Sequence, residues 1–132
     1  MPAQTLTIPA WHPKTNVNGS NARRHWSVIR KNHDIDRDMA WAAAKQAGWV
    51  FVPGKVRLTI TLVYPKRPLP DTDNAYSKIK GCLDGLHCHG CIHQMQHIGF
   101  FRDDSAEHLE LIVRAEVVPG CKQTKIELEA VE

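Results

Sequence analysis

Three segments in which apolar and polar residues alternate constrain the fold more than any other feature of the sequence. They are residues 56–64, 108–118 and 125–131. Alternate residues of a strand point to opposite faces of a sheet, so this pattern predicts strands with one buried face. The link at residues 119–123 is too short for a crossover helix. We therefore expect the last two strands to form a hairpin.

The remaining segments predict helices beside this sheet. A short edge strand is expected at residues 5–8, followed by a loop at 9–22 that is rich in Pro and Asn. A run of Ala and Met predicts a helix from about residue 34 to 47. A second helix is expected at 75–86, where Ile79, Leu83 and Leu86 form an apolar stripe. The sequence thus predicts a single α+β domain over residues 1–132, with a mixed or mainly antiparallel sheet and helices on one face.

Two classes of protein are disfavoured by composition. No stretch approaches the roughly 20 apolar residues that span a bilayer, and the N-terminus lacks the pattern of a signal peptide. We expect a soluble, cytoplasmic protein without a membrane partner. In that compartment the 4 cysteines favour free thiols or a metal site over disulfides.

Charge is distributed unevenly along the chain. Residues 1–70 hold 11 Lys and Arg against 3 Asp and Glu (11 − 3 = +8), whereas residues 71–132 hold 6 against 11 (6 − 11 = −5). A basic half can neutralise phosphates while acidic groups gather elsewhere, so we favour a nucleic-acid ligand. Trp26 lies among basic residues and could stack on an unpaired base. The predicted DNA-contacting residues are Arg23, Arg24, Trp26, Arg30, Lys31, Lys66 and Arg67.

The acidic residues form a pattern that suits a metal ion. Asp71 and Asp73 are two residues apart, so both leave the same face of an extended segment, and Asp103-Asp104 lies just before a predicted strand. Magnesium takes oxygen ligands, including carboxylates, and Lys80 could stabilise charge on a phosphate beside it. The same Asp-Thr-Asp-Asn string is also a good turn and helix N-cap. Both interpretations remain open on spacing alone.

Three blocks of this sequence together resemble the signature of RusA-type Holliday junction resolvases, a family common in prophages. The blocks are Pro70-Asp-Thr-Asp-Asn74, Lys80-Gly-Cys-Leu-Asp-Gly-Leu86 and Gly99-Phe-Phe-Arg-Asp-Asp-Ser105. The start of the chain is loosely similar as well. The resemblance implies a RusA-like fold and a homodimeric, magnesium-dependent endonuclease that cuts four-way DNA junctions by paired nicks in recombination and repair.

Site residues follow from the resemblance block by block. It implies that Asp71, Asp73 and Asp104 are catalytic and hold Mg2+, with Lys80 as the active lysine. Lys78 is the rival lysine, and Lys80 is preferred because it stands four residues before Asp84, as in the family pattern. Asp103 is the weaker member of its pair, and Asp84 is expected to be a helix-surface or structural residue.

The chain departs from the family pattern at about residues 87–98, where His and Cys are concentrated. Cys88, Cys91, His93 and His97 offer two thiolates and two imidazoles, a possible structural Zn2+ set. A polar loop with incidental His and Cys is the alternative. The second hypothesis for the whole protein is accordingly a non-catalytic nucleic-acid-binding module braced by zinc.

Overall fold

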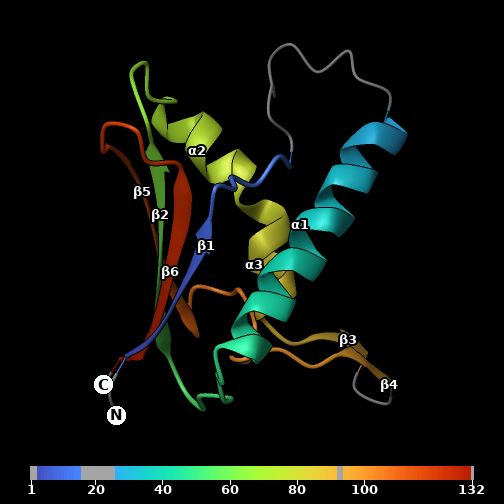
Figure 1. Cartoon of the computed structure of the whole chain (residues 1–132). Coiled ribbons are helices and arrows are strands. Elements are labelled where there is room, and N and C mark those ends of the chain that lie inside the picture. The colour runs from blue at the N-terminus through green and yellow to red at the C-terminus, as the bar shows by residue number, and fades with distance from the viewer. Residues whose placement is uncertain (1–2, 16–25, 92–93, 132) are drawn as a thin grey trace.

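The computed structural model describes residues 3–15, 26–91 and 94–131, with the backbone alone for 89–91 and 94–97. A four-stranded sheet forms one layer, and helices cover one of its faces (Figure 1). This is the α+β architecture that the alternating segments predict. The strands are β1 (Gln4–Pro9), β2 (Val56–Tyr64), β5 (Leu109–Val117) and β6 (Gln123–Ala130).

The strand order is β1-β6-β2-β5, so the prediction of a hairpin between the last two strands is wrong. β2 lies between them, parallel to β5 and antiparallel to β6. The link between β5 and β6 crosses the end of β2, where Val118 N donates to Tyr64 O at 3.0 Å and Gly120 N to Pro65 O at 3.4 Å. Five residues can span two strand spacings of about 4.8 Å each, and local sequence does not reveal that another strand intervenes.

Helix α1 (Trp26–Gln46) begins about eight residues earlier than the predicted helix. Its first two turns contain few strong helix formers, which is why propensity places the start too late. Packing extends the helix, because His33, Asp36 and Ala40 continue the face that carries Ala44 toward α3. Ala40 and Ala44 are completely buried.

The helix predicted at residues 75–86 is two helices, α2 (Thr72–Lys78) and α3 (Lys80–Leu86). Ile79 interrupts the helix with φ −89° and ψ 1°, and its side chain is buried in the core. α2 starts earlier than predicted because the Asp71 carboxylate caps it, accepting a hydrogen bond from Asn74 N at 2.9 Å. The break changes which side chains of the two helices share a face.

Two glycines allow α3 to approach α1 closely. A Cβ on Gly81 would lie 2.8 Å from the carbonyl oxygen of His33, and a Cβ on Gly85 would collide with the carbonyl group of Arg37. Cys82, Leu83 and Leu86 on the neighbouring face of α3 enter the core instead. α3 is therefore held between the sheet and α1, with its remaining face open to the site.

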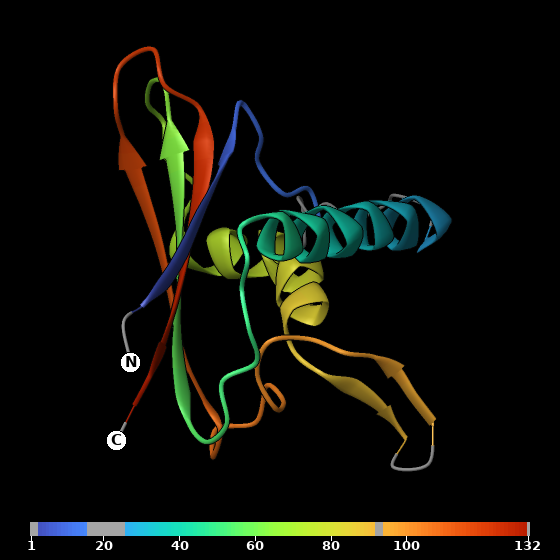
Figure 2. The same ribbon diagram turned by 60° about the horizontal axis from the view of Figure 1, so that its bottom comes forward.

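Strands β3 (His89–Cys91) and β4 (Gln94–His97) form a hairpin in the segment that the sequence marks as a departure from the family pattern. The hairpin projects from the helical layer, away from the sheet (Figure 2). Its base is closed by Cys88 N donating to Phe101 O at 2.9 Å and Phe100 N donating to Leu86 O at 2.6 Å. The segment after the hairpin thus returns to the end of α3.

Within the described residues, no helix has the length and hydropathy of a membrane-spanning segment.

Candidate functional site

One face of α3 and the segment before β5 meet in a cluster of charged side chains. Lys80, Asp84 and His87 are spaced four and three residues apart, so they share a helix face. Lys80 Nζ lies 3.3 Å from Asp84 Oδ1 and 3.5 Å from Asp104 Oδ2. Asp104 is brought there by the backbone hydrogen bonds that return the chain to the end of α3. Two sequence blocks that lie far apart in the chain therefore meet at Lys80.

Asp84 is the most connected carboxylate of this cluster. His33 Nε2 on α1 lies 2.6 Å from its Oδ2, and His87 Nε2 lies 3.3 Å from its Oδ1. Burial acts to raise the pKa of Asp84, but hydrogen bonds from His87 and His33 and the charge of Lys80 outweigh it, so the pKa falls well below its usual range. Asp84 is therefore an anion over the whole physiological pH range.

His87 is oriented by hydrogen bonds on both ring nitrogens. It is 6% exposed, and its Nδ1 donates to the carbonyl oxygen of Cys88 at 2.8 Å. This contact directs Nε2 at Asp84 and at Asp104 Oδ2, the latter 3.9 Å away. Burial lowers the pKa of His87, but the hydrogen bonds to Asp84 and Cys88 and the nearby Asp104 charge raise it above the usual value.

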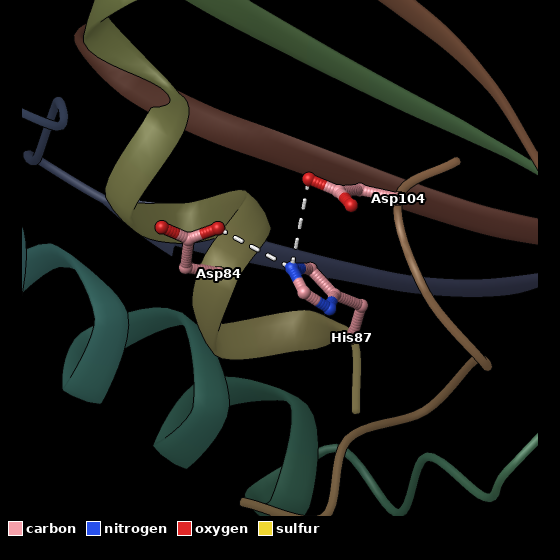
Figure 3. A group of neighbouring side chains, drawn as sticks. All are labelled: Asp84, His87 and Asp104. Carbon is pink, nitrogen blue, oxygen red and sulfur yellow. Dashed lines mark hydrogen bonds and ion pairs between the residues drawn. The ribbon is translucent and has the colours of Figure 1, made fainter. Parts of the chain in front are cut away.

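Asp84, His87 and Asp104 have the geometry of a metal-binding group (Figure 3). One ligand atom from each lies within 4.8 Å of the others. A metal-binding His usually donates its second ring N–H to a carbonyl or carboxylate, as His87 does to Cys88. Two carboxylates suit Mg2+ and Mn2+, and the imidazole nitrogen favours Mn2+ over Mg2+. The donor set therefore fits a divalent ion, with the Lys80 ammonium beside the same carboxylates.

Asp71 and Asp73, which the resemblance implies are metal ligands, are not members of this group. Asp71 caps α2 through Asn74, and the side chain of Asp73 is exposed in the first turn of the same helix. On one continuous helix Asp73, Lys80 and Asp84 would share a side. In the structure the helix is interrupted at Ile79, between Asp73 and Lys80.

The structure places Lys80 and Asp104 in the cluster, and it places the alternatives Lys78 and Asp103 in other contacts. Lys78 Nζ donates to the hydroxyl of Tyr64 at 3.1 Å, whereas Lys80 lies against Asp84 and Asp104. The side chain of Asp103 turns to its own loop.

Asp103 Oδ1 accepts from Ser105 Oγ at 2.7 Å and from His108 Nδ1 at 2.9 Å. Hydrogen bonds from Ser105 and then from His108 lower the pKa of Asp103 to about 2. Asp104, the preferred member in the sequence analysis, is thus the carboxylate that reaches the cluster.

A cavity of about 690 Å3 opens beside the cluster between α1 and α2. Trp26 and Tyr76 give it an aromatic lining, Arg30 contributes a cation, and His33 and Lys80 are shared with the cluster. Trp26 is 65% exposed. This lining suits the base and phosphate of a nucleotide.

The other predicted contact residues have varied locations. Lys31 is exposed on α1, and Lys66 and Arg67 line a second concavity. Arg23 and Arg24 lie outside the described residues.

For most residues of the predicted zinc set, the side chain is not among the described parts of the structure. His93 is outside the described residues, and of Cys91 and His97 only the backbone is described. Cys88 is described, and its Sγ accepts a hydrogen bond from Gly99 N at 3.2 Å. Cys88 immediately precedes β3, and Cys91 is the last residue of that strand. Because a strand rises about 3.3 Å per residue, the backbones of the two cysteines are separated along the strand direction.

Sequence reasoning did not assign three members of the cluster to the site. The sequence predicts a helix-surface or structural role for Asp84, groups His87 with the His- and Cys-rich segment, and gives no signal for His33. The spacing of Lys80, Asp84 and His87 on one helix face is a signal that could have linked them. His33 lies 51 residues from Asp84, and nothing local indicates that contact.

No family model matches the chain. An uncharacterized protein of Xylella fastidiosa is 37% identical over 87 residues, which cover 63% of this chain and 55% of that protein. The chain thus spans about half the length of this relative.

Proposed function

We propose that this protein is a metal-dependent DNA endonuclease related to the RusA-type resolvases. The main support is the meeting of Lys80 with Asp104, because these residues come from two separate blocks of the resemblance and lie 3.5 Å apart. A cation between carboxylates, next to an oriented imidazole and an aromatic cavity, is an arrangement suited to phosphodiester hydrolysis.

In this proposal Asp104, Asp84 and His87 hold a divalent ion. Such an ion supplies Lewis acidity and lowers the pKa of a bound water. Lys80 stabilises the negative charge that develops on the phosphate. His33 keeps Asp84 ionised and oriented through its 2.6 Å contact. The sequence alone predicts Mg2+, and the proposed site suits either Mg2+ or Mn2+.

Branched DNA, in particular a four-way junction, is the proposed substrate. The cavity beside the cluster can accept an unpaired base on Trp26 and Tyr76, with phosphate toward Arg30. Paired nicks need two active sites at a fixed separation, and a symmetric homodimer supplies them.

The exposed face of α1 offers an apolar surface for such a dimer. Ile35 and Met39 are four residues apart and are exposed on that helix. This spacing places them in one stripe.

The proposal is tested by cleavage of a labelled four-way junction with Mg2+, with Mn2+ and with EDTA. We expect symmetric nicks that need the metal. Asp104→Asn should abolish cleavage while DNA binding persists, because it removes a metal ligand without adding bulk. Lys80→Met should lower the cleavage rate by about 10²- to 10³-fold, the usual cost of losing one electrostatic contact to a transition state.

Two further variants sharpen this test. Asp103→Asn is the matched control, since Asp103 is bound to Ser105 and His108 and should be dispensable for cleavage. Asp73→Asn asks whether α2 also contributes, as the resemblance implies. Binding of the junction without cleavage under any divalent metal would contradict the proposal and favour a non-catalytic binding module.

A further inference from the structure

A second concave surface carries basic residues from four separate parts of the chain. Two adjoining concavities of about 500 Å3 and 330 Å3 share His12 and Lys122 in their linings. We call this surface the basic groove. Its cations are Lys14, Lys66, Arg67, Lys78 and Lys122. Among the described residues, no Asp or Glu lines either concavity.

The cations of the basic groove are not compensated by neighbouring carboxylates. Among the described residues, none of the five forms an ion pair, whereas Arg57 and Lys125 on the sheet each pair with a Glu. Gathering like charges is unfavourable unless an anion is bound, and it raises the local concentration of polyanions. The charge pattern therefore indicates an anionic ligand.

The groove is built on a fixed backbone. Buried Asp36 accepts hydrogen bonds from the backbone amides of Lys14 and Thr15 at 2.7 and 2.8 Å. The carbonyl oxygen of Lys122 accepts a hydrogen bond from Ala10 N at 2.7 Å, so the backbone of Lys122 is held against the residue that follows β1. A ligand would thus meet cations whose backbone positions are already set, which reduces the entropy lost on binding.

The floor of the groove is aromatic and uncharged. His12 Nε2 donates to Val63 O at 2.6 Å, and its ring lies 4.3 Å from the ring of Tyr64. Burial lowers the pKa of His12, and the charges of Lys122 and Lys78 lower it further, against the hydrogen bond to Val63. Lys78 lies over the Tyr64 ring. The cations consequently surround an uncharged floor. In such a groove the phosphates of a nucleic-acid strand can contact the cations while its sugars lie over the floor.

We propose that the basic groove binds the phosphodiester backbone of the DNA substrate on the opposite side of the α2–α3 junction from the Lys80 cluster. This inference deepens the proposed function and rests on it for the identity of the polyanion. Lys78 and Lys80 flank the break at Ile79, and their side chains contact Tyr64 and Asp104 respectively. One arm of a branched substrate would lie in the groove while another reaches the cluster.

The test measures binding of a fluorescent four-way junction by anisotropy over a range of NaCl concentrations, without divalent metal so that DNA stays intact. The triple variant Lys14→Gln, Arg67→Gln, Lys122→Gln should bind more than tenfold more weakly at moderate salt. The slope of log K against log [NaCl] should become shallower by about 2.7, because each lost phosphate contact contributes about 0.9.

The matched control removes three cations elsewhere, Lys45→Gln, Lys55→Gln and Arg114→Gln, and should leave the slope nearly unchanged. Circular dichroism checks that both proteins are folded. Equal losses in the two triple variants would overturn the inference, since net charge alone would then explain binding. Unchanged binding by the groove variant would also overturn it.

A comparison with polyglutamate of similar charge tests the ligand class, and equal affinity for this polymer would overturn the assignment to phosphodiesters. Failure of the groove and failure of the endonuclease are distinguishable. A wild-type protein that binds through the groove but never cleaves would refute the proposed function and leave the groove intact.

Discussion

His87 illustrates how one buried side chain can define a site. Its Nδ1 is occupied by the Cys88 carbonyl, so Nε2 is the atom presented to Asp84 and Asp104. The same ring can be a charged partner of the two carboxylates or, deprotonated, a metal ligand between them. Which role it takes depends on competition between a proton and a divalent ion for Nε2.

His33 should act through Asp84 rather than by touching the metal. We predict that His33→Gln weakens Mn2+ binding by about 10- to 100-fold, the range found when a hydrogen-bond partner of a ligand is lost. Isothermal titration calorimetry gives the affinity. His108→Gln is the matched control, because His108 contacts Asp103 instead of the cluster. Equal Mn2+ affinity in wild type and His33→Gln would remove His33 from the site.

At this scale the resemblance named two residues that the structure brings together although they lie 24 positions apart in the chain. Lys80 and Asp104 were singled out, and they lie together. The role of His33 could not be foreseen, because it depends on how closely two helices pack. Spacing alone shows neither the interruption of the helix at Ile79 nor the absence of Asp73 from the group.

At the scale of secondary-structure elements, the contact between α1 and α3 positions the cluster. Gly85 sits against the backbone of Arg37, and this close approach lets His33 reach Asp84. A larger residue at either glycine of α3 would push the helices apart. The metal-binding geometry is therefore tied to the packing of a helix pair.

Gly85→Ala should lower the free energy of unfolding by about 1–3 kcal/mol, the usual cost of overpacking an interior. Urea denaturation measures the change. Gln46→Ala, at the exposed end of α1, should change it by less than about 0.5 kcal/mol. If Gly85→Ala is as stable as wild type, the helices are not as tightly constrained as the structure indicates.

Periodicity predicted strands better than it predicted their neighbours. Residues 56–64 alternate cleanly and form β2 with those bounds. The insertion of β2 between β5 and β6 is set by pairing across the whole sheet, which no local pattern records. The hairpin at 89–97 was likewise missed, because its His- and Cys-rich strands lack alternation.

Across the whole molecule, the two charged surfaces lie on either side of the α2–α3 junction. The acidic cluster with Lys80 faces the segment before β5, and the basic groove lies beside the ends of β1 and β2. Both halves of the sequence contribute to the basic groove, since Lys14, Lys66 and Arg67 come from the basic half and Lys78 and Lys122 from the acidic half. The proposed branched DNA substrate would contact both surfaces at once.

Paramagnetic NMR tests most directly whether Asp84, His87 and Asp104 form the proposed metal site. Substoichiometric Mn2+ should broaden the amide signals of residues 80–88 and 103–105 in 15N-labelled protein, whereas Mg2+ should broaden none. Broadening centred on Asp71–Asn74 that spares Asp84 and His87, or no selective broadening at all, would contradict the account.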